Sequence, residues 1–361
     1  MTITGLSAFY ASTGRLGEPE AVEENLKLET ERLTKCWMRH GRSTLRDYLV
    51  RDVEDPRINV QSILTRHFLV RQLFDGRFDD LMEHELRFCL VVNWLLHLLK
   101  KPVHARQLHA VLDALLMREE EAEELKIPSY ISETFAALTL PNYICDLLTW
   151  SPIETTEVPI RPHLLSTFET IWREVLAGEH PQRISVLEAA CGSANDYRFI
   201  DAFGIGRLLD YTGFDLCEKN IRNAKQMFPA AHFKVGNVLE IDAQDKAFDC
   251  CFVHDLFEHL SMRALEVAIA EICRVTRNGI CVGFFNMYEG DRHVVEAVGD
   301  YHWNKLSVAE TKAAFERYGI VVDVIHIDAF LRSKFGCSDT HNKGAYTFII
   351  RQSARSDAIR R

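Results

Sequence analysis

The chain has 361 residues, of which 47% are hydrophobic and 26% are charged. This length exceeds that of one typical core, so we expect two parts, and the composition excludes a largely disordered protein. Acidic residues outnumber basic ones, 52 to 42, which gives a net charge of −10. Because nucleic-acid binders present a basic face to phosphates, we predict no nucleic-acid partner.

The ten cysteines form neither a CxxC pair nor a zinc-like spacing, and the 15 histidines are equally scattered. Cys89, Cys250 and Cys251 lie within apolar runs, where cysteine behaves as a small buried hydrophobe. The longest apolar stretch, residues 88–99, is shorter than the roughly 20 residues that cross a bilayer. The chain begins without the pattern of a signal peptide. We therefore predict a cytoplasmic protein with no metal site and no membrane partner.

Residues 1–150 are predicted to form an all-helical domain. Leu90, Val91, Trp94 and Leu95 follow the spacing of a helix that is buried on one broad face. This domain, with Phe9 and Tyr10 near its start, is interpreted as a lid, as a substrate-recognition element or as the surface of a homodimer. Residues 151–183 follow as a proline-rich linker and a leading helix at 163–177.

From residue 184 to residue 352, short apolar strands alternate with amphipathic helices. Seven strands are predicted, at residues 184–190, 211–215, 232–235, 248–254, 280–285, 320–327 and 346–351. Four helices are predicted among them, at residues 196–203, 218–227, 262–275 and 308–318. This order indicates an α/β, Rossmann-like, mostly parallel seven-stranded sheet with helices on both faces. The last two strands have no helix between them in this prediction and are expected to pair antiparallel. Residues 353–361 form a tail.

The segment VLEAACGSAND, residues 186–196, is predicted to hold a ligand. A strand ends in Glu188, and a turn of small residues then opens a helix, which lets the backbone approach a ligand at the switch point of the sheet. Only Gly192 stands in the turn, so the dinucleotide fingerprint G-x-G-x-x-G is absent. A cofactor without phosphates is favoured.

Two further strand ends carry polar residues that suit a nucleoside. Asp215 ends the second strand, where a carboxylate can accept hydrogen bonds from a ribose diol; otherwise it caps the next helix. Asn237 follows the third strand and either pairs with an adenine edge or is a simple turn residue.

These elements resemble the class I S-adenosylmethionine-dependent methyltransferases, over about 165 residues. The first motif of that family is an acidic residue followed by G-x-G-x-G, and Glu188, Ala190, Gly192 and Ala194 stand at those places. Alanine fits the two glycine places if the backbone keeps a negative φ. Asp215 matches the ribose-binding acid, and FDCCFVHDLFEHL, from residue 248 on, matches the fourth motif.

The tripeptide EHL, residues 258–260, resembles small-molecule methyltransferases of the quinone-biosynthesis type. The resemblance implies S-adenosylmethionine as cofactor and S-adenosylhomocysteine as product. It implies cofactor binding by Glu188, Ala190, Gly192, Asp215, Leu216, Asn237, Val238 and His254. It does not extend to residues 1–150.

Transfer of a sulfonium methyl needs mainly alignment, and a base where the acceptor must lose a proton. The catalytic candidates are His254, Asp255 and His259, of which His254 ends the fourth strand and ranks first. Each of them has a plainer role open to it, as a helix cap or as a structural histidine. Aromatic residues with polar tips suit a small acceptor. The predicted acceptor contacts are Tyr10, Tyr288, His293, Tyr301, His302 and Trp303.

The resulting hypothesis is methylation of a small-molecule acceptor at O or N by in-line transfer. Two alternatives stay open at this point. One is a protein methyltransferase whose helical domain recruits its partner, and the other is a non-catalytic binding or scaffold protein that keeps the fold.

Overall fold

The computed structural model describes residues 19–40, 55–99, 114–115, 126–138, 160–318, 320–337 and 342–352. Ahead of the sheet it shows the helices α2 (Pro19–His40), α3 (Val60–Phe74), α4 (Asp79–Leu99), α6 (Ser129–Ala136) and α8 (Ile160–Ala177). The described part of residues 1–150 is thus helical, as predicted. Phe9 and Tyr10 lie outside the described residues. No described helix combines the length and apolar character that crossing a membrane requires.

A seven-stranded sheet forms the centre of the molecule, with the order β10-β11-β5-β4-β1-β2-β3. Its strands are β1 (Ile184–Ala189), β2 (Leu209–Asp215), β3 (His232–Val235), β4 (Phe248–His254), β5 (Thr276–Phe284), β10 (Ile320–His326) and β11 (Tyr346–Gln352). All pairs are parallel except those of β11, which runs antiparallel to both β5 and β10. The predicted Rossmann-like sheet is confirmed. Its strand order reverses at β1 and β4, where such sheets bind ligands.

Within the described ranges, five helices and two short 3-10 helices connect the strands. They are α9 (Asn195–Ala202), η3 (Gly206–Leu208), α10 (Glu218–Met227), η4 (Phe257–His259), α11 (Met262–Val275), α12 (Val308–Glu316) and α13 (Ile327–Phe335). Short strands β6 (Met287–Tyr288), β7 (Ala297–Val298), β8 (Tyr301–His302) and β9 (Leu306–Ser307) lie between β5 and α12.

The prediction that no helix separates the last two strands is wrong, because α13 stands between β10 and β11. The helix is only nine residues long and buries one narrow face, with Ile327, Leu331 and Phe335. Its end carries the expected signals, since Gly336 adopts a left-handed φ of 70° and basic residues occupy the last turn. The two strands nevertheless pair antiparallel, as predicted.

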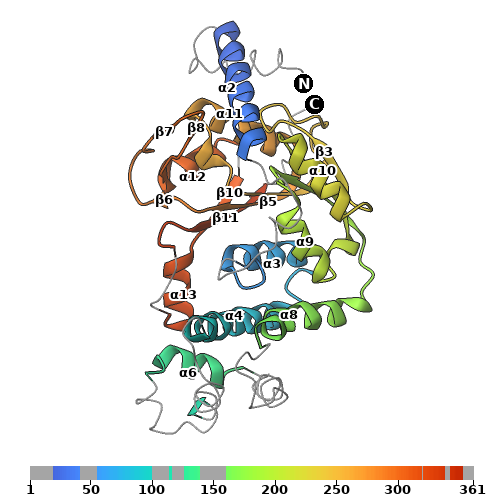
Figure 1. Ribbon diagram of the computed structural model, residues 1–361, viewed down its shortest axis with the longest axis vertical. Helices are drawn as coiled ribbons and strands as arrows, with labels where there is room; N and C mark the ends of the chain where they lie inside the picture. Colours follow the sequence, from blue (N-terminus) through green and yellow to red (C-terminus); the bar gives the residue numbers. More distant parts are fainter. Residues whose placement is uncertain are drawn as a thin grey trace, which may run out of the picture.

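One face of the sheet is covered by α3, α9 and α10, and α4 and α8 form a further layer beyond α3 (Figure 1). Helix α3 begins at Asn59, whose side chain accepts hydrogen bonds from the N–H groups of Gln61 and Ser62, a cap that contributes about 1 kcal/mol. Phe68 of α3 packs beside Gly279 of β5, where any larger residue would crowd its ring. The helical part and the sheet therefore share one hydrophobic core.

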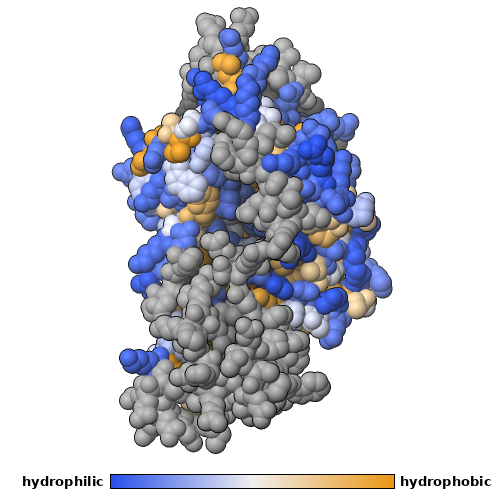
Figure 2. Space-filling view, in the orientation of Figure 1, coloured by the Kyte–Doolittle hydropathy of each residue, from blue (hydrophilic) through white to orange (hydrophobic). Residues whose placement is uncertain are grey.

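The opposite face is covered by α11 and α12, with α2 standing beside α11 (Figure 1). Leu33 of α2 is buried in the same apolar cluster as Val238 and Phe257. On the visible surface, hydrophilic residues predominate over α2 and α10 (Figure 2). Thus α2 reaches the loop after β3, near the predicted cofactor residues.

Candidate functional site

The turn after β1 has a backbone that glycine favours, although alanine occupies two of its places. Ala190, Gly192 and Ala194 all have positive φ, of 60°, 54° and 64°. The condition under which alanine fits the two glycine places, a negative φ, is therefore not met. A left-handed conformation costs a residue with a Cβ about 1–2 kcal/mol. This turn therefore stores strain at the switch point of the sheet.

Asp215 and Gly192 meet at this turn, as the cofactor hypothesis requires. The Asp215 carboxylate accepts hydrogen bonds from the N–H of Gly192 at 3.0 Å and from the N–H of Cys217 at 2.8 Å. Burial raises the pKa of Asp215, and these hydrogen bonds oppose the rise. A Cβ added to Gly192 would meet no atom within 4 Å, so the space beside this glycine is open. The arrangement fits a nucleoside cofactor. The alternative role of Asp215 as a helix cap is met only in part, because Asp215 accepts the N–H of the N-cap residue Cys217 but α10 has no side-chain cap bond.

Glu188 lies beneath the turn. It is 3% exposed, and Tyr211 donates a hydrogen bond to its carboxylate at 2.5 Å. Burial raises the pKa of Glu188 well above its ordinary value, and the nearby Asp196 carboxylate adds to the rise. The side chain is thus held by Tyr211, and its role in binding the cofactor stays a prediction.

Asn237 follows β3 and is engaged by α2. Its amide donates to the Thr30 hydroxyl at 3.2 Å, while its carbonyl oxygen accepts from the N–H of Leu239. The neighbouring Val238 is buried, and Leu216 after β2 is half-buried. The predicted adenine end of the site is therefore covered by α2.

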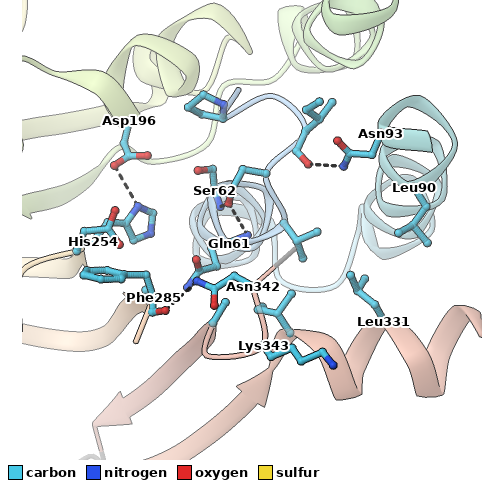
Figure 3. A pocket seen from close by; sticks show the side chains of 18 of the residues that line it. Gln61, Ser62, Leu90, Asn93, Asp196, His254, Phe285, Leu331, Asn342 and Lys343 are labelled. Atoms are coloured by element: carbon cyan, nitrogen blue, oxygen red, sulfur yellow. Dashed lines mark hydrogen bonds and ion pairs between the residues drawn. The ribbon is translucent and has the colours of Figure 1, made fainter. Parts of the chain in front are cut away.

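A cavity of about 1110 Å³ opens between the strand ends and the helical part. Figure 3 shows Asp196 and His254 at one end, Gln61 and Ser62 of α3 beside them, and Leu90 of α4 across the space. The cavity is open to the surface, so water fills it when no ligand is bound.

His254 ends β4 and is held from both sides. Its Nδ1 lies 3.0 Å from Asp196 of α9, and its Nε2 lies 2.7 Å from the Thr65 hydroxyl of α3. Thr65 donates its own proton to the Gln61 carbonyl, so both ring nitrogens of His254 are placed to donate. Burial lowers the pKa of His254, but Asp196 outweighs it and raises the pKa to about 9. The ring is therefore protonated at neutral pH.

His259 of η4 differs from His254, because its pKa is lowered rather than raised. It lines the cavity, and its Nδ1 lies 3.1 Å from the carbonyl oxygen of His302, so Nδ1 carries the proton of the neutral ring. Burial lowers the pKa of His259, and the bond to His302 opposes this only in part. The rings of Phe285 and Trp303 lie 5.6 and 5.4 Å from the imidazole. A neutral imidazole on the wall of the cavity can accept a proton.

Two carboxyl groups stand beside these histidines. Asp255 lines the cavity in a left-handed backbone conformation, with φ of 50°. Glu258 is fully buried and accepts hydrogen bonds from the N–H groups of Phe285 and Asn286. Burial raises the pKa of Glu258 to about 8, and the nearby Asp255 carboxylate adds to the rise. Strained and titration-shifted groups thus gather at the ends of β4 and β5, which is typical of functional sites.

The predicted acceptor residues separate into two groups. Trp303 lines the cavity, and Tyr301 packs against His259 at 5.6 Å. His293, by contrast, accepts the N–H of Ser307, and Tyr288 donates to the carbonyl of Arg292. These two support the loop after β5 and are not among the cavity residues. His302 contributes its backbone carbonyl, which contacts the His259 ring. Tyr10 lies outside the described residues.

The helical part contributes cavity residues that sequence reasoning missed. Gln61 donates from its amide to the carbonyls of Phe284 and Tyr346, at 2.7 and 2.8 Å, and so ties α3 to the ends of β5 and β11. The cap signal of Asn59 could have marked the start of α3. Gly283 is a second residue that could have marked the site in the sequence, because a Cβ at this position would lie 2.6 Å from the His254 ring.

Residues 186–279 match the family model of a methyltransferase domain. No curated protein matches the sequence. Solved structures similar to this chain include the [4+2]-cyclase SpnF, at 14% identity over 53% of this chain and 82% of that one, with a TM-score of 0.38. The PH0226 protein from Pyrococcus horikoshii matches at 16% identity over 59% and 99%, with a TM-score of 0.37.

A third similar structure is the 1,6-didemethyltoxoflavin-N1-methyltransferase of Burkholderia thailandensis, solved with 1,6-didemethyltoxoflavin and S-adenosylhomocysteine bound. It matches at 14% identity over 52% of this chain and 77% of that one, with a TM-score of 0.37. The three likenesses concern the fold alone.

Proposed function

We propose that this chain is an S-adenosylmethionine-dependent methyltransferase that methylates O or N of a small molecule held in the cavity. The observation that carries the proposal is the position of the cavity. It begins at the carboxyl ends of β4 and β5, beside the first turn of α9, and is closed on the far side by α3 and α4. Reacting groups in open α/β sheets lie at these strand ends.

The turn after β1 and the end of β2 hold the cofactor in this proposal. Asp215 is placed to exchange its hydrogen bond to Gly192 for bonds to a ribose diol, and the open space beside Gly192 admits the ligand. When bound, the cofactor supplies a sulfonium methyl, whose bond to sulfur breaks as the acceptor's O or N forms the new bond. The walls of the cavity align that acceptor and exclude water from it.

His259 is the better candidate for the base, although His254 ranked first by position. A base must begin unprotonated, and the Asp196 partner holds the proton on His254. His259 is neutral, and its bond to the His302 carbonyl orients the ring. In this proposal His259 accepts the proton that the acceptor loses, and the His254–Asp196 pair positions α9 against β4.

Titration calorimetry with S-adenosylhomocysteine tests the cofactor assignment. We expect binding to the wild-type chain and a loss of at least about tenfold in affinity for Asp215→Ala, because a charge-assisted bond pair is removed. Asp210→Ala is the matched control, since Asp210 lies exposed on the same strand. Absence of binding to folded wild-type protein at millimolar ligand would falsify the assignment.

A non-catalytic binding protein is the second candidate, and two contacts favour it. The carboxylate of Asp215 and the amide of Asn237 are both engaged within the chain, by Gly192 and by Thr30. This candidate predicts that Asp215→Ala leaves affinity for S-adenosylhomocysteine unchanged. The same calorimetry therefore separates the two functions.

A further inference from the structure

The half of the cavity away from His254 has an apolar wall built from three helices. Leu90 comes from α4, Tyr130 from α6 and Leu331 from α13, and they are 6%, 9% and 4% exposed. Figure 3 shows Leu90 and Leu331 projecting into the same space, at the end opposite Asp196 and His254. The end of α13 is attached to α4, since Lys334 lies 3.1 Å from Glu83. This wall is therefore a built part of the fold.

The polar side chains between the two ends are engaged by the backbone of the chain. Gln61 donates to the carbonyls of Phe284 and Tyr346, Asn59 caps α3, and Asn93 donates to the carbonyl of Ile58. Among the described residues that line the cavity, Lys343 is the one lysine or arginine, and it is exposed. This half therefore presents apolar surface, and water against it is displaced favourably by an apolar ligand.

We propose that the acceptor is an amphiphilic molecule whose apolar body, a fused-ring system or an aliphatic chain, lies between α4, α6 and α13. Its nucleophilic O or N then reaches the opposite end, beside Asp255 and His259. The inference rests on the proposed function for the reaction and on the cavity alone for the ligand class.

The test uses the neutral fluorescent probe N-phenyl-1-naphthylamine, added to the full chain saturated with S-adenosylhomocysteine. We expect saturable binding to the wild-type chain and a loss of at least about tenfold in affinity for Leu331→Gln, which places an amide in the apolar wall. Leu331→Trp fills the space with an apolar side chain and is expected to weaken the probe equally. Ala329→Gln, on the exposed side of α13, is the matched control and keeps wild-type affinity.

Failure of the probe to bind the wild-type chain, or equal binding by all three variants, overturns the inference. Displacement of the probe by S-adenosylhomocysteine also overturns it, because the two ligands then share one place. Calorimetry on the same samples keeps the two proposals distinguishable. Cofactor binding without probe binding contradicts only the proposed class of acceptor. Probe binding without cofactor binding contradicts the methyltransferase proposal.

Discussion

The His254–Asp196 pair and the Thr65 hydroxyl join three elements through three side chains. His254 lies on β4, Asp196 on α9, and the Thr65 hydroxyl on α3 completes the chain of contacts. Burial raises the pKa of Asp196, but His254 outweighs it and the pKa is lowered below 3.8, whereas the pKa of His254 is raised from 6.5 to about 9. The pair is therefore charged across the neutral range.

The pair makes stability depend on pH. The pKa of His254 is higher in the folded protein than in the unfolded chain. The contribution of this histidine to folding stability is therefore complete below pH 6.5 and is lost as the pH rises through about 9. We expect the free energy of unfolding to fall over this window by at most about 3 kcal/mol. Asp196→Asn should remove most of this slope, and Asp210→Asn, at an exposed position, should keep it. Urea unfolding at pH 6.5 and pH 9 measures both, and equal slopes in the two variants contradict the assignment.

Single residues of the site differ in how far the sequence predicts them. Asp215 and Gly192 meet as expected, because a motif within one βαβ unit is brought together by local geometry. Gln61 and Leu331 could not be predicted as neighbours, since they come together only when α3 and α13 pack at the ends of β5 and β11. The charge of His254 likewise depends on Asp196, a partner from a different element.

At the scale of elements, one carboxylate attaches α2 to the start of α11. Glu29 accepts hydrogen bonds from the N–H and the hydroxyl of Ser261, at 2.8 and 2.5 Å, where α11 begins. The Ser261 hydroxyl also caps α11 by accepting from the N–H of Ala264. The start of α11 is thus satisfied with or without α2, so this contact holds α2 rather than α11.

Glu29→Gln should therefore loosen α2 selectively. Hydrogen bonds to charged groups contribute about 1.5–3 kcal/mol, so we expect amide exchange in α2 to become at least about tenfold faster, with little change in α11. Hydrogen exchange followed by mass spectrometry measures both helices. Glu31→Gln, at an exposed position of α2, serves as the control. Faster exchange in α11 alone would show that Glu29 acts as its cap.

Sequence patterns located most of the sheet's elements because their signals are local. The predicted bounds of β3, β4, α10 and α11 coincide with the observed ones, since apolar periodicity and a following turn mark each of them. Helix α13 was missed because it follows β10 without a turn and begins at Ile327, the last residue of the apolar run that we predicted as one strand. The packing of α3 on the sheet left no periodic signal, because it depends on contacts between distant parts of the chain.

At the scale of the molecule, Glu85 connects the layers of helices. Its carboxylate accepts hydrogen bonds from Arg66 of α3 at 3.0 Å and from Trp172 of α8 at 2.8 Å, and it lies 2.7 Å from His67. The guanidinium of Arg66 stacks on Phe203, which follows α9. Glu85 and its three polar partners are all buried. One buried charge thus joins α3, α4 and α8 above the core that they share with the sheet.

Glu85→Gln tests whether the helices and the sheet unfold together. Loss of the carboxylate leaves the Arg66 charge buried without its counter-ion, which costs about 3–5 kcal/mol. Because the core is shared, we expect one urea transition at a lower midpoint, with tryptophan fluorescence and circular dichroism coinciding. Asp80→Asn, an exposed change on the same helix, should cost less than about 1 kcal/mol. Two separate transitions in Glu85→Gln would mean that α3, α4 and α8 form a domain that folds apart from the sheet, and the cavity between them would then be a mobile interface.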